Sequence, residues 1–376
     1  MKKNLVLISL DTLRADVAYS GGFDGIEFLR KRGVTFINTI SSSPLTPVSH
    51  STVFTGLQPY HHGVRHLFKE KLQDNSVRLA EYFKKEGYDT GAIVSCPGMN
   101  KWYGFGKGFD HYDDEIPRLP DGSDPLLTVD VKKRGVALKR ANIVAERAKK
   151  WFDARDTSNP YFLFLHFFDA HWPYEAPEKF GGNNIYEEEV AFSCHYLNTF
   201  LEYLDKSGNL ENTTIVCFSD HGEDLNGLYK NDKGGDELGH PEELGHGCLL
   251  YNQTQKVALI VCDDNLPKGI NIETQVRLVD VAPTILDMFN IKHEKLDGET
   301  LLPIIKGDKR ELLGYCETYY PEEQTQATGG KFSEANNKQA FIIDNNFKII
   351  INLESNEFEF YNLKTDPDEK TNNYVR

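Results

Sequence analysis

The sequence lacks the features of a secreted or membrane-bound protein. No apolar stretch approaches the length of a membrane span, and the apolar run at residues 5–10 covers only six positions before Asp11. The six cysteines are scattered, without a CxxC pair or a dense framework. We therefore expect no signal peptide, no membrane span and reduced thiols in a cytoplasmic setting.

An excess of basic charge is also missing. The formal net charge is -15, whereas proteins that bind nucleic acids hold the phosphate backbone with a basic surface. The sequence therefore predicts no nucleic-acid partner. A small anionic substrate is still compatible with this charge, because one bound metal ion can invert the local field of a site. The composition leaves the oligomeric state open.

The chain has 376 residues, of which 39% are hydrophobic and 26% are charged. This length and composition predict a globular protein with a full hydrophobic core. Uninterrupted apolar runs are typical of strands buried on both faces of a parallel sheet. They occupy residues 5–10, 90–94, 161–166, 214–218 and 256–261. Helical periodicity between them covers residues 25–32, 76–86, 139–155 and 187–206. This alternation predicts a layered, mostly parallel α/β sheet flanked by helices.

The pattern changes after about residue 305. Short β-rich pieces at residues 341–343, 347–352 and 358–361 are joined by turn-forming residues. We therefore expect a catalytic α/β domain over residues 1–305 and a small C-terminal antiparallel β subdomain over residues 306–376.

Acidic and imidazole side chains follow three of the predicted strands. Asp11 follows the first run, Asp220 and His221 follow residues 214–218, and His171 follows residues 161–166. Ligands of open α/β sheets bind at the carboxyl ends of the strands. Carboxylates with an imidazole suit Mn²⁺, Mg²⁺, Ca²⁺ or Zn²⁺. Alternatively, Asp11 only caps the next helix and Asp220 begins a capped turn.

Thr46 is a candidate nucleophile. Pro44 and Pro47 lie on either side of Thr46, so the chain is not expected to be helical before Thr46. A helix is expected over residues 48–55, with Pro47 near its first turn and Thr46 at the N-cap. The free N–H groups of that helix end would face an anion, and a hydroxyl beside a metal ion can ionise and attack. In the alternative interpretation, Thr46 only caps the helix.

Eight segments, in order along nearly the whole chain, resemble the motifs of the sulfatase family within the sulfatase and alkaline phosphatase superfamily. They are NLVLISLDTLRAD, SPLTPVSHSTVFTGLQPYHHGV, HFFDAHWPY, FSDHGE, GHGCLLYNQTQKVALIV, VRLVDVAPTILDMFNI, DGETLLPIIKG and FKIIINLESNEFEFYNLKTDPDEKTN. The resemblance implies an alkaline-phosphatase-like fold. It also implies that Asp11, Asp220 and His221 bind a metal ion together with the hydroxyl of Thr46.

The nucleophile position departs from the sulfatase pattern. In the family it lies ten residues before the glycine of a Thr-Gly pair, which here is Gly56, so the position is Thr46. Sulfatases carry there a Cys or Ser that is oxidised to formylglycine within C/S-x-P-x-R. This chain has Thr-Pro-Val-Ser-His, so no formylglycine is expected. The resemblance is then to the phosphoesterases of the superfamily that use threonine.

Four further positions take their roles from the resemblance. Thr12 stands where many sulfatases have another metal-binding Asp, and His50 stands where they have Arg; both are assigned to substrate binding, and one metal ion is expected. His171 and His246 are assigned to catalysis, at the transferred group or the leaving oxygen. Alternatively, His246 is an ordinary residue of a surface loop.

These assignments predict a metal-dependent hydrolase of a phosphate-type ester (phosphodiester, phosphonate or phosphomonoester) through a covalent Thr46 intermediate. A sulfatase and a non-catalytic binding protein on the same scaffold are the alternatives. The expected substrate is an anionic ester of a small molecule, glycan or lipid headgroup. The polar segment at residues 222–247, with seven glycines, is predicted to form a mobile flap that delivers His246; a surface insertion is the alternative. His61 and His62 are expected to be structural.

Overall fold

The computed structural model describes residues 2–67, 69–129, 139–176, 179–227, 232, 234–241, 243, 245–319 and 337–375. These residues fall into two compact units, each formed from three stretches of chain. Unit 1 comprises Met1–Thr35, Val77–Ser219 and Ala258–Asn271. Unit 2 comprises Phe36–Ser76, Asp220–Val257 and Ile272–Arg376.

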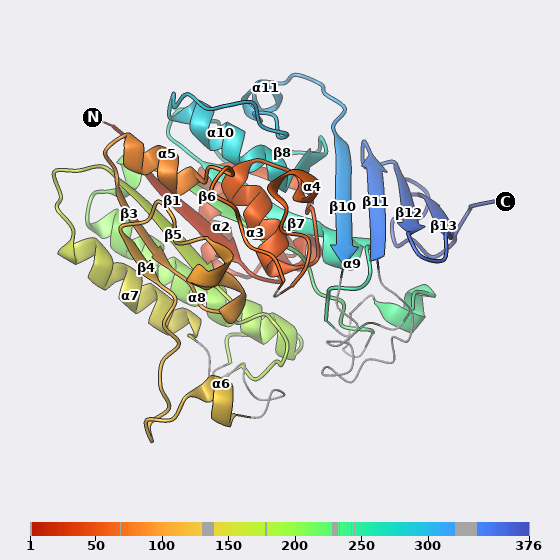
Figure 1. Ribbon diagram of the computed structural model, residues 1–376, viewed down its shortest axis with the longest axis horizontal. Helices are drawn as coiled ribbons and strands as arrows, with labels where there is room; N and C mark the ends of the chain where they lie inside the picture. Colours follow the sequence, from red (N-terminus) through yellow and green to blue (C-terminus); the bar gives the residue numbers. More distant parts are fainter. Residues whose placement is uncertain are drawn as a thin grey trace. The chain divides into compact units, whose positions relative to one another are not determined.

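Unit 1 is built on a mostly parallel sheet (Figure 1). Its strands, in spatial order, are β4 (His111–Asp113), β3 (Asp89–Ile93), β5 (Tyr161–Phe167), β1 (Asn4–Leu10), β6 (Thr213–Phe218) and β7 (Lys256–Cys262), the last of which lies in unit 1 from Ala258 onward. Each neighbouring pair is parallel except β6 and β7, which are antiparallel. Every residue of β1, β5 and β6 is buried, as expected for strands covered on both faces.

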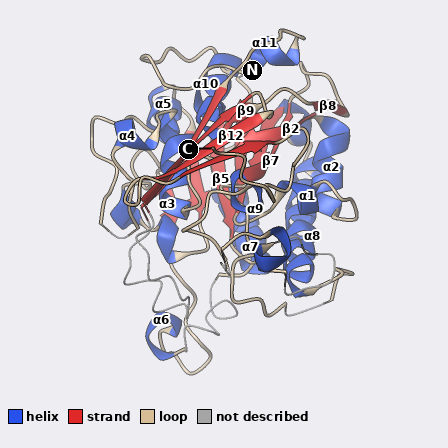
Figure 2. Cartoon of the chain, turned by 90° about the vertical axis from the view of Figure 1, so that its right-hand side faces the viewer, coloured by secondary structure: helices blue, strands red, loops and turns tan. Residues whose placement is uncertain are grey.

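Helices cover this sheet. The helices of unit 1 are α1 (Ala15–Ala18), α2 (Asp24–Arg32), α5 (Leu79–Lys85), α6 (Pro125–Thr128), α7 (Ala141–Ala154) and α8 (Ile185–Lys206). Figure 2 shows α2 and α8 on one side of the strands and α5 on the other. α8 packs against both α2 and α7, and α7 also packs on β3 and β5. Among the residues that the structure describes, no helix has both the length and the apolarity needed to cross a membrane.

Unit 2 holds a second, antiparallel sheet and several short helices. The sheet is β10 (Leu313–Tyr319), β11 (Asn337–Ile343), β12 (Phe347–Asn352) and β13 (Phe358–Asn362), paired in that order. The helices are α3 (Thr46–Thr55), α4 (Pro59–His62), α9 (Asn252–Gln255), α10 (Val281–Met288) and α11 (Leu302–Ile305). Most of β2 (Val34–Ile40) belongs here and pairs in parallel with β9 (Val276–Arg277); the short β8 (Ile270–Ile272) spans the division.

The fold class predicted from the sequence is confirmed, because a mostly parallel sheet with flanking helices and a separate antiparallel sheet are both present. Two local predictions were wrong. The helix expected from residue 76 begins at Leu79, because Glu81 accepts a hydrogen bond from the backbone N–H of Arg78 and closes a capping box there. The C-terminal sheet has a fourth strand, β10, which the predicted short β-rich pieces did not include. The domain boundary at residues 305 and 306 stays a prediction.

Candidate active site

One set of polar side chains, the strand-end group, lies at the carboxyl edge of the unit 1 sheet. It consists of Asp11, just beyond β1, His166, near the end of β5, and Ser95, just beyond β3. Ser9 of β1 lies opposite His166 in the parallel ladder. Asp11 stands two residues beyond Ser9, and its backbone N–H donates to the carbonyl of Phe167 at 2.9 Å. Side chains two residues apart share a face of a strand, so backbone pairing alone brings Asp11 and His166 together.

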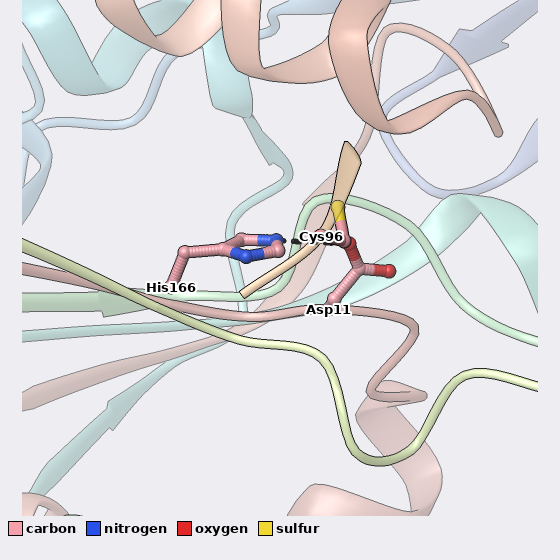
Figure 3. A group of neighbouring side chains, drawn as sticks. All are labelled: Asp11, Cys96 and His166. Atoms are coloured by element: carbon pink, nitrogen blue, oxygen red, sulfur yellow. Dashed lines mark hydrogen bonds and ion pairs between the residues drawn. The ribbon is translucent and has the colours of Figure 1, made fainter. Parts of the chain in front are cut away.

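The strand-end group is linked by hydrogen bonds. The Nε2 atom of His166 lies 2.9 Å from Oδ2 of Asp11 (Figure 3). The backbone N–H of Ser95 donates to Nδ1 of His166 at 3.3 Å, and the Ser95 hydroxyl donates to the His166 carbonyl at 2.8 Å. Cys96 also lies beside them, with one ligand atom each of Cys96, Asp11 and His166 within 4.8 Å of one another. All four residues are buried.

Thr12 has a special backbone conformation. Its φ angle is 58°, in the left-handed region that β-branched residues rarely adopt. The Tyr186 hydroxyl donates to the Thr12 carbonyl at 2.8 Å, and the Thr12 hydroxyl donates to the Asp11 carbonyl at 2.7 Å. These contacts hold a sharp turn directly after Asp11. Such local strain gathers at functional sites; the predicted role of Thr12 in substrate binding stays a prediction.

A second set, the helix-and-turn group, lies in unit 2 and contains Thr46, Asp220 and His221. Thr46 is the first residue of α3, and Leu45 is the N-cap. The Thr46 hydroxyl oxygen lies 3.2 Å from Nε2 of His221, and Oδ2 of Asp220 lies 3.4 Å from the same nitrogen. Asp220 and His221 are completely buried, and Thr46 nearly so. The predicted N-cap role of Thr46 was wrong, because the N-cap of α3 is Leu45 and Thr46 is already the first helical residue, with its hydroxyl facing His221.

The backbone around the helix-and-turn group is held by serine and histidine side chains. The hydroxyl of Ser49 donates to the Asp220 carbonyl at 2.8 Å, and that of Ser41 contacts the same oxygen. His50 lies one helical turn after Thr46, with Nδ1 2.8 Å from the Thr46 carbonyl and 3.4 Å from Oδ2 of Asp220. The predicted substrate-binding residue His50 therefore lies against both the predicted nucleophile Thr46 and a predicted metal ligand, Asp220.

His246 is fixed beside this group. Its Nδ1 lies 3.2 Å from Oε1 of the buried Glu223, and its ring centroid lies 4.1 Å from that of His221. Asp224 and Gly245 form an isolated antiparallel bridge with two hydrogen bonds of 2.7 Å. The two ends of the predicted flap are thus joined next to His246. Residues 228–231, 233, 242 and 244 of this segment lie outside the described residues, and its mobility stays a prediction.

The other predicted catalytic histidine, His171, belongs to unit 1. Its ring stacks on Phe168, with centroids 4.1 Å apart. The segment is anchored two residues earlier, where Asp169 lies 2.9 Å from Arg140, which also binds Glu189 at 2.6 Å. Burial raises the pKa of Glu189 to about 7, although the Arg140 charge opposes the shift. Two buried carboxylates thus share one guanidinium beneath the His171 segment.

The donor atoms of the helix-and-turn group fit a metal ion. Nδ1 of His221 lies 3.0 Å from the carbonyl of Gly222, an oxygen that can only accept, so in the neutral ring Nδ1 carries the proton. Nε2 then presents a lone pair toward Thr46 and Asp220. Neighbouring donor atoms 3.2–3.4 Å apart suit ligands bound to one cation at about 2.0–2.5 Å. Two oxygens and a nitrogen are compatible with all four expected ions.

The structure places the predicted residues in two groups and shows what the sequence did not reveal. Thr46, His50, Asp220, His221 and His246 gather in unit 2, whereas Asp11, Thr12 and His171 belong to unit 1. The sequence missed His166, Glu223, Ser41 and Ser49. His166 could have been found from the sequence, because it places an imidazole at the carboxyl end of an otherwise apolar buried strand.

The histidines expected to be structural behave differently from those of the site. Nε2 of His62 lies 3.1 Å from the Thr52 hydroxyl, and burial lowers the pKa of His62 to about 3, so this ring is neutral. Nδ1 of His61 lies 2.7 Å from Oδ2 of Asp297. Both contacts join elements of unit 2, which is consistent with the structural roles expected of these two residues.

Comparisons with known proteins agree with this fold. The sulfatase family model matches residues 3–291, and the model of the N-sulphoglucosamine sulphohydrolase C-terminal region matches residues 246–376. An arylsulfatase of Clostridium perfringens is 22% identical, over 99% of this chain and 90% of its own. The phosphonate monoester hydrolase of Agrobacterium radiobacter has a TM-score of 0.75 at 20% identity, over 99% of this chain and 91% of its own. A structure in complex with its substrate D-glucosamine-2-N,6-O-disulfate also has a TM-score of 0.75, at 16% identity, over 99% and 93% of the two chains.

The site places a buried hydroxyl beside an imidazole and a carboxylate, on an alkaline-phosphatase-like α/β fold. Together with the match to the sulfatase family model, this identifies the protein class as an ester hydrolase. The chain belongs to the sulfatase family. The predicted superfamily and enzyme class are thereby confirmed.

Proposed function

We propose that this enzyme hydrolyses a phosphate-type ester, namely a phosphodiester, phosphonate ester or phosphomonoester, through a covalent intermediate on Thr46. The observation that carries the proposal is the place of Thr46: it is the first residue of α3, is nearly buried, and lies 3.2 Å from Nε2 of His221. A threonine needs no oxidation before it acts as a nucleophile. The solved phosphonate monoester hydrolase is a precedent for hydrolysis of a phosphorus ester on this fold.

The proposed metal ligands are Asp11, Thr46, Asp220 and His221. Support for adding Asp11 comes from the ladder of unit 1, in which Ser9 of β1 pairs with Phe218 of β6. Asp11 and Asp220 each follow these paired residues by two positions, so the chain delivers both carboxylates from adjacent parallel strands. The chemistry that a divalent cation supplies at such a site is a lower pKa for the bound hydroxyl and stabilisation of charge on the ester oxygens.

The proposed reaction has two steps. On ionisation the Thr46 hydroxyl passes its proton to water, and Oγ1 attacks phosphorus while the bond from phosphorus to the leaving oxygen breaks. The leaving oxygen takes a proton from His171 or His246. Water then attacks the phosphothreonine, the bond to Oγ1 breaks, and Thr46 regains a proton. Glu223 fixes the His246 ring through Nδ1, which directs Nε2 of His246 to the proton transfer.

Of the two alternative functions, only one has support of its own. A sulfatase is favoured by both matching family models and by the disulfated sugar bound to one structural relative; Thr46 in place of an oxidisable Cys or Ser argues against it. A non-catalytic binding protein is disfavoured by the preserved donor set. We propose an anionic ester of a small molecule, glycan or lipid headgroup as substrate, and a cytoplasmic location.

A panel of paired aryl esters tests the proposal. The enzyme is stripped with a chelator, restored with Mn²⁺, Mg²⁺, Ca²⁺ or Zn²⁺, and assayed on matched phosphomonoester, phosphodiester, phosphonate and sulfate esters. We expect metal-dependent turnover of a phosphorus ester and an acid-quenched adduct on Thr46 by mass spectrometry, with residue 46 otherwise unmodified. Faster turnover of the sulfate ester, an aldehyde at Ser42 or Ser43, or a ketone at residue 46 (the oxidation product of a threonine side chain) would establish the sulfatase instead.

A further inference from the structure

The cluster of Asp11, Cys96 and His166 (Figure 3) has the residue types of a metal site. Its hydrogen bonds indicate a different role. Nδ1 of His166 receives the backbone N–H of Ser95 at 3.3 Å. A backbone amide can only donate, so Nδ1 must carry the lone pair, and the proton of the neutral ring lies on Nε2.

That tautomer decides what His166 can do. With its proton on Nε2, the ring donates a hydrogen bond to Oδ2 of Asp11 at 2.9 Å. To bind a metal through Nε2, the ring would have to move its proton to Nδ1, where it would meet the N–H of Ser95. The backbone of β3 therefore keeps His166 in the form that donates a hydrogen bond and disfavours the form that binds a metal.

We propose that His166 is a positioning residue that orients Asp11 for metal binding, by holding one carboxylate oxygen so that the other is presented to the ion. The proposal rests on Asp11 being a metal ligand, as proposed above. The hydrogen-bonded chain runs across three adjacent strands: Ser95 lies beyond β3, His166 on β5 and Asp11 beyond β1. All three residues are buried, so water does not compete for these hydrogen bonds.

A satisfied core histidine is the rival explanation, and two features favour positioning. The acceptor is a carboxylate at a strand end, directly before the strained residue Thr12, rather than a neutral group inside the sheet. A ligand carboxylate with two rotatable side-chain bonds loses conformational freedom when it binds a cation, and a hydrogen bond made beforehand reduces that loss. The expected effect of removing it is a loss of metal affinity of about 10–100-fold.

The experiment compares substitutions of His166 in the chelator-stripped full-length protein. Calorimetric titration uses whichever of Mn²⁺, Mg²⁺, Ca²⁺ and Zn²⁺ binds the wild type most tightly. His166→Gln keeps an N–H near the place of Nε2, and we expect an affinity within about threefold of wild type. His166→Leu removes the donor at similar size, and we expect about 10–100-fold weaker binding. Equal affinity of the Gln and Leu variants would overturn the proposal.

Three controls separate this proposal from its rivals. Leu165 is buried and lies on the opposite face of β5 from His166. The Leu165→Ala variant should therefore have a lower melting temperature but an unchanged metal affinity. Should His166→Leu fail to fold, His166→Asn replaces it, because its shorter amide cannot reach Asp11. Cys96→Ala should leave the metal stoichiometry and affinity unchanged, and loss of a bound ion in this variant would show that the cluster is a metal site.

Asp11→Asn distinguishes failure of this proposal from failure of the proposed function. If Asp11→Asn binds the ion as wild type does, the metal site itself is wrongly assigned. If Asp11→Asn loses affinity while His166→Leu does not, only the positioning role is refuted.

Discussion

The two groups of polar residues each contain a buried histidine, and the backbone fixes these rings in opposite tautomers. In the strand-end group, the N–H of Ser95 points at Nδ1 of His166, which leaves the proton on Nε2. In the helix-and-turn group, the carbonyl of Gly222 faces Nδ1 of His221, which leaves a lone pair on Nε2. One ring therefore supports a carboxylate by donating a hydrogen bond, and the other presents a lone pair that can bind a cation. The chemical role of a buried histidine is set by the backbone group behind it.

The two groups also differ in how they are built. The strand-end group follows from the pairing of β1, β3 and β5, whose backbones are hydrogen-bonded to one another. The helix-and-turn group depends on side chains, since Ser41 and Ser49 reach the carbonyl of Asp220. We therefore expect substitutions in the second group to affect chemistry most directly, and the predictions below run from the largest effect to the smallest.

The largest effects are expected within the helix-and-turn group. Thr46→Ala removes the nucleophile and should lower kcat by a factor of at least about 10⁴, while calorimetry still detects metal binding. Asp220→Ala should abolish metal-dependent turnover and weaken metal binding strongly, with an unchanged circular dichroism spectrum. Turnover of either variant close to that of wild type would contradict the assigned role.

His246 should show an intermediate effect. His246→Ala removes a proposed proton donor, and kcat/KM for the best ester should fall by about 10²–10³-fold. Glu223→Gln leaves the ring but weakens its hydrogen bond, so a smaller loss, about tenfold, is expected. If kcat/KM of His246→Ala equals that of wild type, His246 has no catalytic role, and the proposed flap over residues 222–247 loses its main support.

The smallest effect concerns the stability of unit 1. Burial raises the pKa of Glu189 to about 7 from its ordinary value of 4.5. Between these values the native protein holds a proton that the unfolded chain has lost, so the free energy of unfolding should fall as pH rises through this range. Glu189→Gln should reduce this dependence, by about 1–3 kcal/mol between pH 4.5 and 7.5. Urea unfolding at several pH values measures it; Glu202→Gln, on the exposed side of α8, should leave the dependence unchanged.

Most of the fold could be predicted because its signals are local. The apolar runs at β1, β5, β6 and β7 are strands, since only residues buried on both faces tolerate such sequences. The prolines around Thr46 place the start of α3 correctly to within two residues. β10 was missed because Leu313–Tyr319 mixes polar and apolar residues, and its place in the sheet depends on pairing with β11.

The sequence by itself determined which chemical groups are available and at which strand or helix ends they stand: Asp11 beyond β1, Asp220 and His221 beyond β6, and Thr46 at the start of α3. Only the tertiary structure decided how these groups are held. The contacts of His166 with Asp11, Ser49 with Asp220 and Glu223 with His246 join residues 23–171 positions apart. Hydrophobic periodicity specifies which face of an element is buried, but it does not specify which polar side chain meets which. That choice, together with the tautomer of each histidine, depends on backbone groups from other elements, which come together only when the chain folds.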